Sequence, residues 1–537
     1  MSRTFGTYGP SHPLPGTMTT RILSSLLKRY AQKKQVHAAT SSYAQERIAS
    51  LQKKFSRGEH VYLLGIGSGV HNSGIALVEV TPNGEVHLLF NNEEERFRAI
   101  KHCSDYPEMA VDELLTQMAH LHISVSDIHA CLTTFDFSKM APNIIRTAVD
   151  EFPASLSLLK PAALAGVREN VGSKFDLSIV FDTPRRLGRQ LGLPGPFPNI
   201  MMRHHDAHAH FSYAVSPFRH DPDPVIVAVM DGFGDDSSVS LYVGQHGTLK
   251  LIYKNTHLFD SLGLLYGTLS STLGGWPMLS SEGRYMGAAA WGNSDRRTNP
   301  YYMQLRQIVY FAPEGEMYLN RAFANWPVQG WIKPFKTKLI EILGKPIPFS
   351  EMWNPDAILN VEEVTHREIT QERVDKAAAV QLLFEDVLFH ILRHFIQTTG
   401  SHKIILTGGC ALNCIANMRL LQAFDEAYYE RYLDQKETRL HLWVPPTPSD
   451  AGVTMGATYA FALAHGAKAS DPLQHAFYCG LPIPSTDITQ ILEADDTIAF
   501  LKLGNVQDAP QRERIADLLA YLIAHDGGSR ADHHARA

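Results

Sequence analysis

The chain has 537 residues, of which 44% are hydrophobic and 19% charged, and its formal net charge is −6. This balance is typical of a globular protein with two or three domains, and it gives no overall attraction to nucleic acid or anionic lipid. No run of about 18 apolar residues suits a membrane span, and the first residues lack the apolar block of a secretory signal. We therefore expect a cytoplasmic protein with no membrane span and no nucleic-acid partner.

Residues 1–58 differ in charge from the remainder, because they contain ten Lys and Arg residues and the single acidic residue Glu46. The segment TTRILSSLLKRYAQKK places apolar residues on one helical face and basic residues opposite, and AQERIASLQKKF repeats the pattern. Such helices could lie on a membrane surface or contact RNA. We favour a basic helical extension docked on the main body.

Two hairpin patterns follow, about 160 residues apart. Residues 61–90 read as strand, glycine-rich loop, strand, tight turn and strand, and residues 225–254 repeat this order. Small residues in the first loop of each copy let backbone N–H groups approach a phosphate. The repeat predicts a duplicated actin-like (RNase H-like) α/β fold of two lobes, residues 59–224 and 225–470, with nucleotide between them. These loops contain Gly67 and Gly69 in the first copy and Asp231, Gly232 and Gly234 in the second, and the family resemblance given below implies that they lie on the phosphate side.

The stretch RHHDAHAHFSYAV, residues 203–215, contains four histidines and one aspartate within eight positions. If it is helical, His204 and His208 lie one turn apart on the same face, and both imidazoles can reach one cation. An equally open alternative is that these histidines form hydrogen bonds at a domain boundary.

The second half of the chain supplies the partners of these histidines. Residues 372–400 predict a core-facing helix, and KIILTGGCALNCIANMRLL predicts a short strand, a small-residue loop and a helix. Gly408, Gly409 and Asn413 in that loop are candidate nucleotide contacts, because a helix N-terminus favours an anion, although a plain connection is the alternative. Asp450, before a helix of small residues, is the carboxylate best placed to complete a two-histidine, one-carboxylate metal site.

Eight segments in order carry a resemblance to a known family. They are IGSGVHNSGIALV, NNEEERFRAIKH, HHDAHA, MDGFGDDSSVSLY, SLGLLYGTLSSTLGGWP, EGRYMGAAAWG, TGGCALN and PPTPSDAGVTMGA. Between about residue 60 and residue 480, the chain resembles the O-carbamoyltransferases of nodulation-factor and antibiotic biosynthesis. Their first domain is similar to the tRNA threonylcarbamoyl transferases and is actin-like.

The resemblance implies a reaction in two stages. Carbamoyl phosphate and ATP give carbamoyl adenylate at a YrdC-like C-terminal domain, and the actin-like domain transfers the carbamoyl group to a hydroxyl of a small-molecule acceptor. It also implies that His204, His208 and Asp450 bind a divalent metal, iron first and magnesium as a possibility. His71 would stand beside the acyl group as general base, with Lys101 near the same site.

Two departures from the family pattern stand out. Asn72 follows His71 where the family has an acidic residue, and the arginine motif of the C-terminal domain is missing. We therefore expect residues 471–537 to be the truncated start of that domain, and the chain to be deficient in activating carbamoyl phosphate. The alternatives are an inactive nucleotide- and metal-binding remnant and an actin-fold kinase for a small substrate. The acceptor and the oligomeric state, with a homodimer as one option, stay open.

Overall fold

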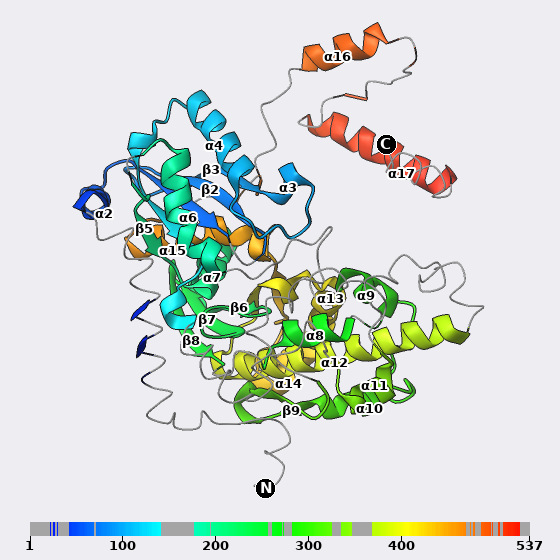
Figure 1. Ribbon diagram of the computed structural model, residues 1–537. Coiled ribbons are helices and arrows are strands. Elements are labelled where there is room, and N and C mark those ends of the chain that lie inside the picture. Colours follow the sequence, from blue (N-terminus) through cyan, green and yellow to red (C-terminus); the bar gives the residue numbers. More distant parts are fainter. Residues whose placement is uncertain are drawn as a thin grey trace. The chain divides into compact units, whose positions relative to one another are not determined.

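Two five-stranded sheets with the same strand order organise the computed structural model (Figure 1). The structure describes residues 42–68, 71–140, 177–193, 195–255, 260–270, 282–324, 335–345 and 368–468, with shorter pieces within 22–30, at 272, at 473, at 476–477 and within 485–526. The first sheet has the order β3-β2-β1-β4-β5 and the second has the order β8-β7-β6-β11-β12. In each, an antiparallel meander of three strands continues into two parallel strands beside its first strand. This repetition is the predicted duplicated actin-like α/β fold.

The first lobe is built on the first sheet. Its strands are β1 (Val61–Gly67), β2 (Gly74–Val80), β3 (Val86–Glu93), β4 (Ile128–Thr133) and β5 (Asn199–Met201). Its helices are α3 (Glu95–Arg98), α4 (Glu108–His120), α6 (Leu177–Gln190) and α7 (His204–Ala214). A short 3-10 helix, Val125–Asp127, precedes β4.

The second lobe is larger and contains the longest helix. Its main strands are β6 (Val225–Met230), β7 (Val239–Gln245), β8 (Thr248–Lys254), β11 (Lys403–Thr407) and β12 (His441–Trp443), with a separate pair β9 (Val309–Phe311) and β10 (Met317–Leu319). Its helices are α8 (Leu262–Ser270), α9 (Glu282–Ala289), α10 (Tyr302–Leu305), α11 (Thr337–Leu343), α12 (Glu368–Thr399), α13 (Cys414–Ala423), α14 (Glu426–Leu433) and α15 (Val453–Ala464). Short 3-10 helices are Arg306–Ile308, Pro313–Gly315, Gly409–Leu412 and Asp450–Gly452.

The strand sequences explain which strands are central and which lie at an edge. Every residue of β6, VIVAVM, is buried, as expected for a central strand that pairs in parallel with β11 and antiparallel with β7 and is covered on both faces. The edge strand β8, TLKLIYK, has no fully buried residue and carries two lysines. Charged residues on an edge strand discourage pairing with another chain.

Helices α7 and α15 cross at the junction of the lobes, and each packs on the sheet of the other lobe as well as on its partner helix. A Cβ on Gly456 of α15 would lie 2.4 Å from the Ala207 carbonyl oxygen of α7. Phe211 and Tyr459 meet edge to face across the same crossing, with ring centroids 5.5 Å apart. The small residues of α15 are therefore needed for the close approach of the two backbones.

The N-terminal helix α2 (Ser42–Ser56) docks on the first lobe. Leu51 is fully buried in a cluster with strand residues of that lobe, and the Arg47 guanidinium donates to the Ile128 carbonyl of β4. The apolar face predicted for the preceding helix is about half exposed at Ile22 and Leu26.

The chain divides into two units, residues 1–478 and residues 479–537. In the second unit the structure describes α16 (Ser485–Ala494) and α17 (Ala509–Asp526). None of the described helices is long and apolar enough to cross a bilayer. The four cysteines within the described residues form no disulfide.

We predict that Gly456→Ala lowers the free energy of unfolding by about 1–3 kcal/mol, because overpacking forces the two helices apart. The matched control is Gly287→Ala in α9, where an added Cβ meets nothing within 4 Å. This second change should be neutral or stabilise by up to about 1 kcal/mol, because alanine is the better helix former. Urea denaturation of both variants measures the difference, and equal stabilities would contradict the tight crossing.

Candidate functional site

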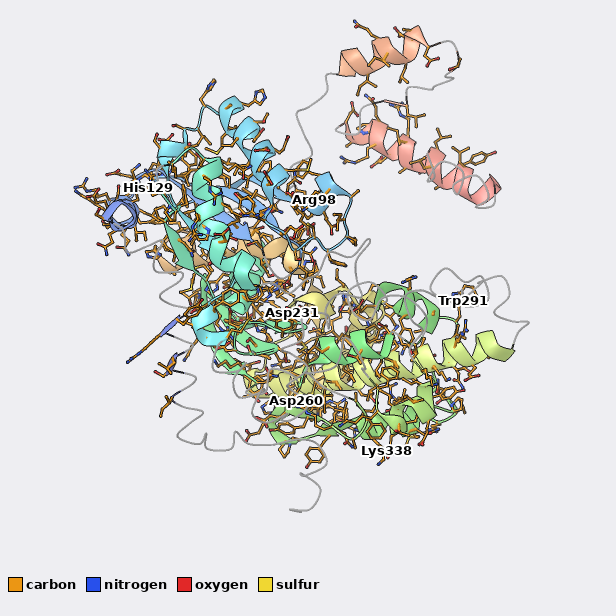
Figure 2. The ribbon with its side chains drawn as sticks, viewed as in Figure 1. Arg98, His129, Asp231, Asp260, Trp291 and Lys338 are labelled. Atoms are coloured by element: carbon orange, nitrogen blue, oxygen red, sulfur yellow. The ribbon has the colours of Figure 1, made fainter. Side chains whose placement is uncertain are left out.

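The candidate site lies where the carboxyl ends of strands from both sheets meet. His71 follows β1, His204 follows β5, Asp231 follows β6, Gly409 follows β11 and Asp450 follows β12. In open α/β sheets, this edge is where loops and helix N-termini converge on ligands. Figure 2 labels Asp231 at the junction of the two lobes.

His204 is fully buried at the start of α7 and has a defined tautomer. Its Nδ1 lies 3.2 Å from the Thr134 carbonyl oxygen, which can only accept, so Nδ1 carries the proton. Its ring stacks on Phe135 with centroids 4.2 Å apart and planes 12° apart. The remaining nitrogen, Nε2, faces two carboxylates: Asp231 Oδ2 at 3.3 Å and Asp450 Oδ1 at 3.4 Å.

His208 presents its imidazole to the same point from one helical turn further on. Its Nε2 lies 3.4 Å from Asp450 Oδ1 and 4.0 Å from Asp231 Oδ2. This nitrogen is buried and makes no hydrogen bond to any residue that the structure describes. A buried nitrogen without a partner is costly unless a ligand or ion meets it.

Asp231 and Asp450 complete the group. Asp231 Oδ1 accepts a hydrogen bond from the Gly409 N–H at 2.9 Å, which turns Oδ2 toward the histidines. The four possible ligand atoms of His204, His208, Asp231 and Asp450 all lie within 4.8 Å of one another, and all four residues are buried. Two imidazoles and two carboxylates suit iron, manganese or zinc, so the residues present fit a divalent cation.

The electrostatics of the group follow from its mixed charges. Burial alone would raise the pKa of Asp450, but His71 and His204 outweigh burial and hold that pKa well below its usual range. Burial alone would lower the pKa of His204, but Asp450 and the hydrogen bond to Asp231 raise it well above the ordinary value. Without metal, the proton held by His204 therefore offsets part of the carboxylate charge, and a divalent cation would replace it.

A further carboxylate, Asp235, supports His204 from behind. It accepts hydrogen bonds from the backbone N–H of His204 at 2.5 Å and of Asp136 at 2.6 Å. Burial raises the pKa of Asp235 from 3.8 to about 6, against the opposing effect of the nearby His204.

We predict a pH effect from Asp235 on the stability of the metal-free protein. Because its pKa is raised in the folded state, the folded protein holds a proton that the unfolded chain has lost between about pH 4 and pH 6. The contribution of Asp235 to the free energy of unfolding is therefore complete at low pH. It is lost as the pH rises through about 6, and the total loss is roughly 3 kcal/mol. Asp235→Asn should flatten this part of the stability curve in urea denaturation. A wild-type curve parallel to that of the variant would contradict the prediction.

His71 lies on the other side of Asp450. Its Nε2 is 3.3 Å from Asp450 Oδ2, the oxygen turned away from His204 and His208. Its Nδ1 is 2.6 Å from Asn72 Oδ1. The structure therefore brings His71 to the edge of the candidate metal site.

Lys101, the second catalytic candidate from the sequence, has a different partner. Its ammonium contacts Glu95 Oε1 at 2.8 Å, and 60% of its side chain is exposed. The other oxygen of Glu95 accepts from the His102 N–H at 2.8 Å. Glu95 thus fixes the 101–102 loop, and Lys101 is held on its outer surface.

Several of the glycines that the sequence predicted to contact nucleotide allow close packing instead. A Cβ on Gly234 would lie 2.7 Å from the His205 ring, and one on Gly408 would lie 2.4 Å from the Met230 carbonyl oxygen. Gly67 packs between Thr134 and Thr454, with each threonine 3.4 Å from the place of a Cβ. Space at Gly232 is open, and Gly69 lies outside the described residues.

The side chain of Asn413 and the backbone N–H of Gly409 both form hydrogen bonds with other protein groups in this structure. Asn413 Oδ1 accepts from the Ala416 N–H as the cap of α13, and its amide pairs with Gln381 through two hydrogen bonds of 2.9 and 3.0 Å. The Gly409 N–H donates to Asp231. The loop that the sequence assigned to nucleotide therefore orients a carboxylate of the candidate metal site.

Sequence reasoning placed Asp231 with the phosphates and did not single out Asp235, Phe135 or Glu93. The only available signal for Asp231 was an aspartate directly after the buried strand β6. The positions of Phe135 and Asp235 beside His204 had no signal of their own.

The fold and site together define a duplicated actin-like protein with a candidate two-histidine, two-carboxylate metal centre. The family model described as the carbamoyltransferase N-terminus matches residues 62–459. The chain belongs to the carbamoyltransferase family.

Similar proteins come from bacteria. The chain is 26% identical to an uncharacterised protein, sll1178, of Synechocystis, over 74% of this chain and 56% of that protein. It is 26% identical to nodulation protein NolNO of Sinorhizobium fredii, over 68% of this chain and 43% of that protein. The chain thus spans about half the length of the curated relatives it matches. Among solved structures, full-length HypF in its phosphate- and nucleotide-bound form matches 76% of this chain and 56% of that one, with 10% identity and a TM-score of 0.36.

Proposed function

We propose that this chain is a metal-dependent O-carbamoyltransferase. It would take a carbamoyl group that originates from carbamoyl phosphate and is activated with ATP as carbamoyl adenylate, and pass it to a hydroxyl of a small-molecule acceptor. Membership of the carbamoyltransferase family supports the reaction class. The hydroxyl acceptor and the adenylate come from the family resemblance of the motifs.

The observation that carries the proposal is the shared carboxylate of Asp450. One of its oxygens faces the imidazoles of His204 and His208, and the other faces His71 Nε2. A basic nitrogen therefore lies directly beside a group of four buried metal donors. This is the arrangement needed to remove a proton from a nucleophile next to a site of concentrated positive charge.

The chemistry at this site divides between the residues. A divalent cation held by His204, His208, Asp231 and Asp450, with iron as our first choice, would supply positive charge near the nucleotide phosphates. His71 Nε2 accepts the proton of the acceptor hydroxyl while the hydroxyl oxygen bonds to the carbamoyl carbon. The anhydride C–O bond breaks, and the electron pair leaves with AMP.

The nucleotide would lie against the loops that carry Asp231–Gly234 and Gly408–Asn413. Both loops follow adjacent parallel strands, β6 and β11, and both reach the metal donors. The open space at Gly232 leaves its backbone accessible to a phosphate.

The test is transfer from preformed carbamoyl adenylate, which separates this step from carbamoyl phosphate activation. Purified protein loaded with Fe²⁺ under anaerobic conditions is incubated with the adenylate and a panel of hydroxyl compounds, and products are identified by mass spectrometry. A carbamate ester formed together with AMP supports the proposal. ADP and a phosphorylated product from ATP would indicate a kinase instead, and tight ATP binding with no product from any acceptor would indicate a binding protein.

A further inference from the structure

A short chain of side chains leads from His71 away from the metal donors. Asn72 is 92% buried and lies between three groups: its Oδ1 is 2.6 Å from His71 Nδ1 and 3.2 Å from His102 Nδ1, and its Nδ2 donates to Glu93 Oε1 at 2.6 Å. Glu93 is the last residue of β3 and is itself 96% buried. All the contacts join residues at one edge of the first sheet.

The carboxylate of Glu93 determines which way the Asn72 amide points. A carboxylate can only accept hydrogen bonds, so the NH₂ end of Asn72 must face Glu93 and the oxygen must face the histidines. Burial raises the pKa of Glu93 above its ordinary value, and the Asn72 hydrogen bond and Arg96 offset only part of that rise. The second oxygen of Glu93 lies 3.9 Å from the Arg96 guanidinium, which supports the charged form.

The orientation of Asn72 in turn determines the tautomer of His71. An amide oxygen facing Nδ1 requires Nδ1 to carry a proton, so any gain or loss of a proton by His71 takes place at Nε2. Nε2 is the nitrogen that faces Asp450 and the metal donors. If the amide were reversed, its NH₂ would face Nδ1, the proton would move to Nε2, and His71 could not act as a base at the site.

We propose that Glu93 is a positioning residue that acts through Asn72 to keep a proton on His71 Nδ1, so that Nε2 is the nitrogen that exchanges a proton at the site. The proposal rests on the proposed function in that it gives His71 the role of base. The proposal explains why the residue after His71 can be the neutral Asn72 where the family has an acidic residue. The buried negative charge is supplied by Glu93 of β3, which contacts His71 only through Asn72. The same amide oxygen also orients His102, because both imidazoles donate to it.

The backbone at Asn72 limits which substitutions are informative. Its φ is 53°, in the left-handed region, where asparagine and aspartate are tolerated and other side chains are strained. An alanine at this position would therefore mix strain with the loss of the hydrogen bonds. Asn72→Asp and Glu93→Gln avoid this, and they can be combined.

The test is a double-mutant cycle. In Glu93→Gln, the glutamine can offer Asn72 either end, so the amide loses its fixed direction. In Asn72→Asp, two carboxylates meet at the place of a 2.6 Å hydrogen bond and repel. In the double variant, the introduced glutamine donates to the introduced aspartate, and that aspartate also accepts from His71, so both hydrogen bonds return with the charge exchanged.

We expect each single variant to lower kcat for carbamoyl transfer at least about tenfold with little change in KM, and the double variant to recover most of it. The second readout needs no activity. Ring ¹⁵N shifts of His71, assigned with a His71→Gln sample and recorded well above the ordinary imidazole pKa with and without Zn²⁺, report the tautomer directly. The Nδ1–H form should dominate in the wild type and the double variant and fall in both single variants.

Glu94→Gln is the matched control. Glu94 is the neighbouring buried carboxylate, and it accepts from the Met109 and Ala110 N–H groups at the start of α4. The Glu94→Gln substitution should leave the His71 tautomer unchanged. A wild-type tautomer in Glu93→Gln, or a double variant no better than the worse single variant, would overturn the proposal. If the wild type transfers no carbamoyl group, the ¹⁵N result still decides the positioning role while the proposed function fails separately.

Discussion

Replacing His208 with glutamine is expected to remove divalent metal binding while leaving the fold intact. His208 is one of four buried donors, and its Nε2 makes no hydrogen bond within the described part of the chain. Glutamine approximately fills the space of the imidazole. The free energy of unfolding of the metal-free variant should therefore lie within about 1 kcal/mol of that of the metal-free wild type. Affinity should fall by at least about 100-fold, since losing even an outer partner of a metal ligand costs roughly 10- to 100-fold.

The measurement is metal content after loading with Fe²⁺, Mn²⁺ or Zn²⁺, together with the thermal shift that each ion produces. Metal that binds only the folded state raises its stability by mass action, so the shift should vanish in the variant. His210→Gln is the matched control, because His210 lies on the same helix and directs its Nδ1 to the Asp206 carbonyl oxygen. Equal metal content and thermal shift in the His208 variant and the wild type would show that the four residues do not form a metal site.

The repeated lobes could be predicted from the sequence because each copy has the same local signals. Residues 61–90 and 225–254 form the expected meanders β1–β3 and β6–β8. The crossing of α7 and α15 could not be predicted. Helical periodicity shows that a face is buried, but it does not show that the face meets the sheet of the other lobe. Only the abundance of small residues in α15 indicated a close backbone contact.

The candidate site was predictable to the extent that its residues lie within one helix. His204 and His208 could be paired from their spacing alone, since residues four apart share a face. The role of Asp231 could not be read in the same way. An Asp-Gly pair after a strand has the same sequence signal whether its backbone N–H groups face a phosphate or its carboxylate faces a metal. The deciding contact comes from the Gly409 N–H, in the 3-10 helix after β11 and 178 residues away.

The run Glu93-Glu94-Glu95 shows the same limit in three consecutive residues. Glu93 holds Asn72, Glu94 caps the start of α4, and Glu95 holds the His102 backbone and Lys101. Their chemistry is identical, and their roles differ because β3 ends within the run and the chain turns into α3. Tertiary contacts, which the sequence does not contain, assign each carboxylate its partner.

Replacing His71 with glutamine is expected to lower kcat for carbamoyl transfer by about 10²- to 10⁴-fold, the usual contribution of a general base. The glutamine amide can donate to Asp450 Oδ2, which lies 3.3 Å from His71 Nε2 in the wild type, so the metal donors should keep their places. Metal content and affinity should therefore remain within about twofold of the wild type.

These readouts separate the loss of a base from damage to the metal site. His87→Gln supplies a control of the same chemical change, since the His87 side chain is 47% exposed on β3 and faces Glu85. Retention of metal with a large loss of kcat assigns the proton transfer to His71. Loss of metal in His71→Gln would instead make His71 a support for Asp450, and an unchanged rate would place the base elsewhere. Because Asp450 faces His71 with one oxygen and the metal-donor histidines with the other, this single substitution decides whether the two functions of the site are distinct.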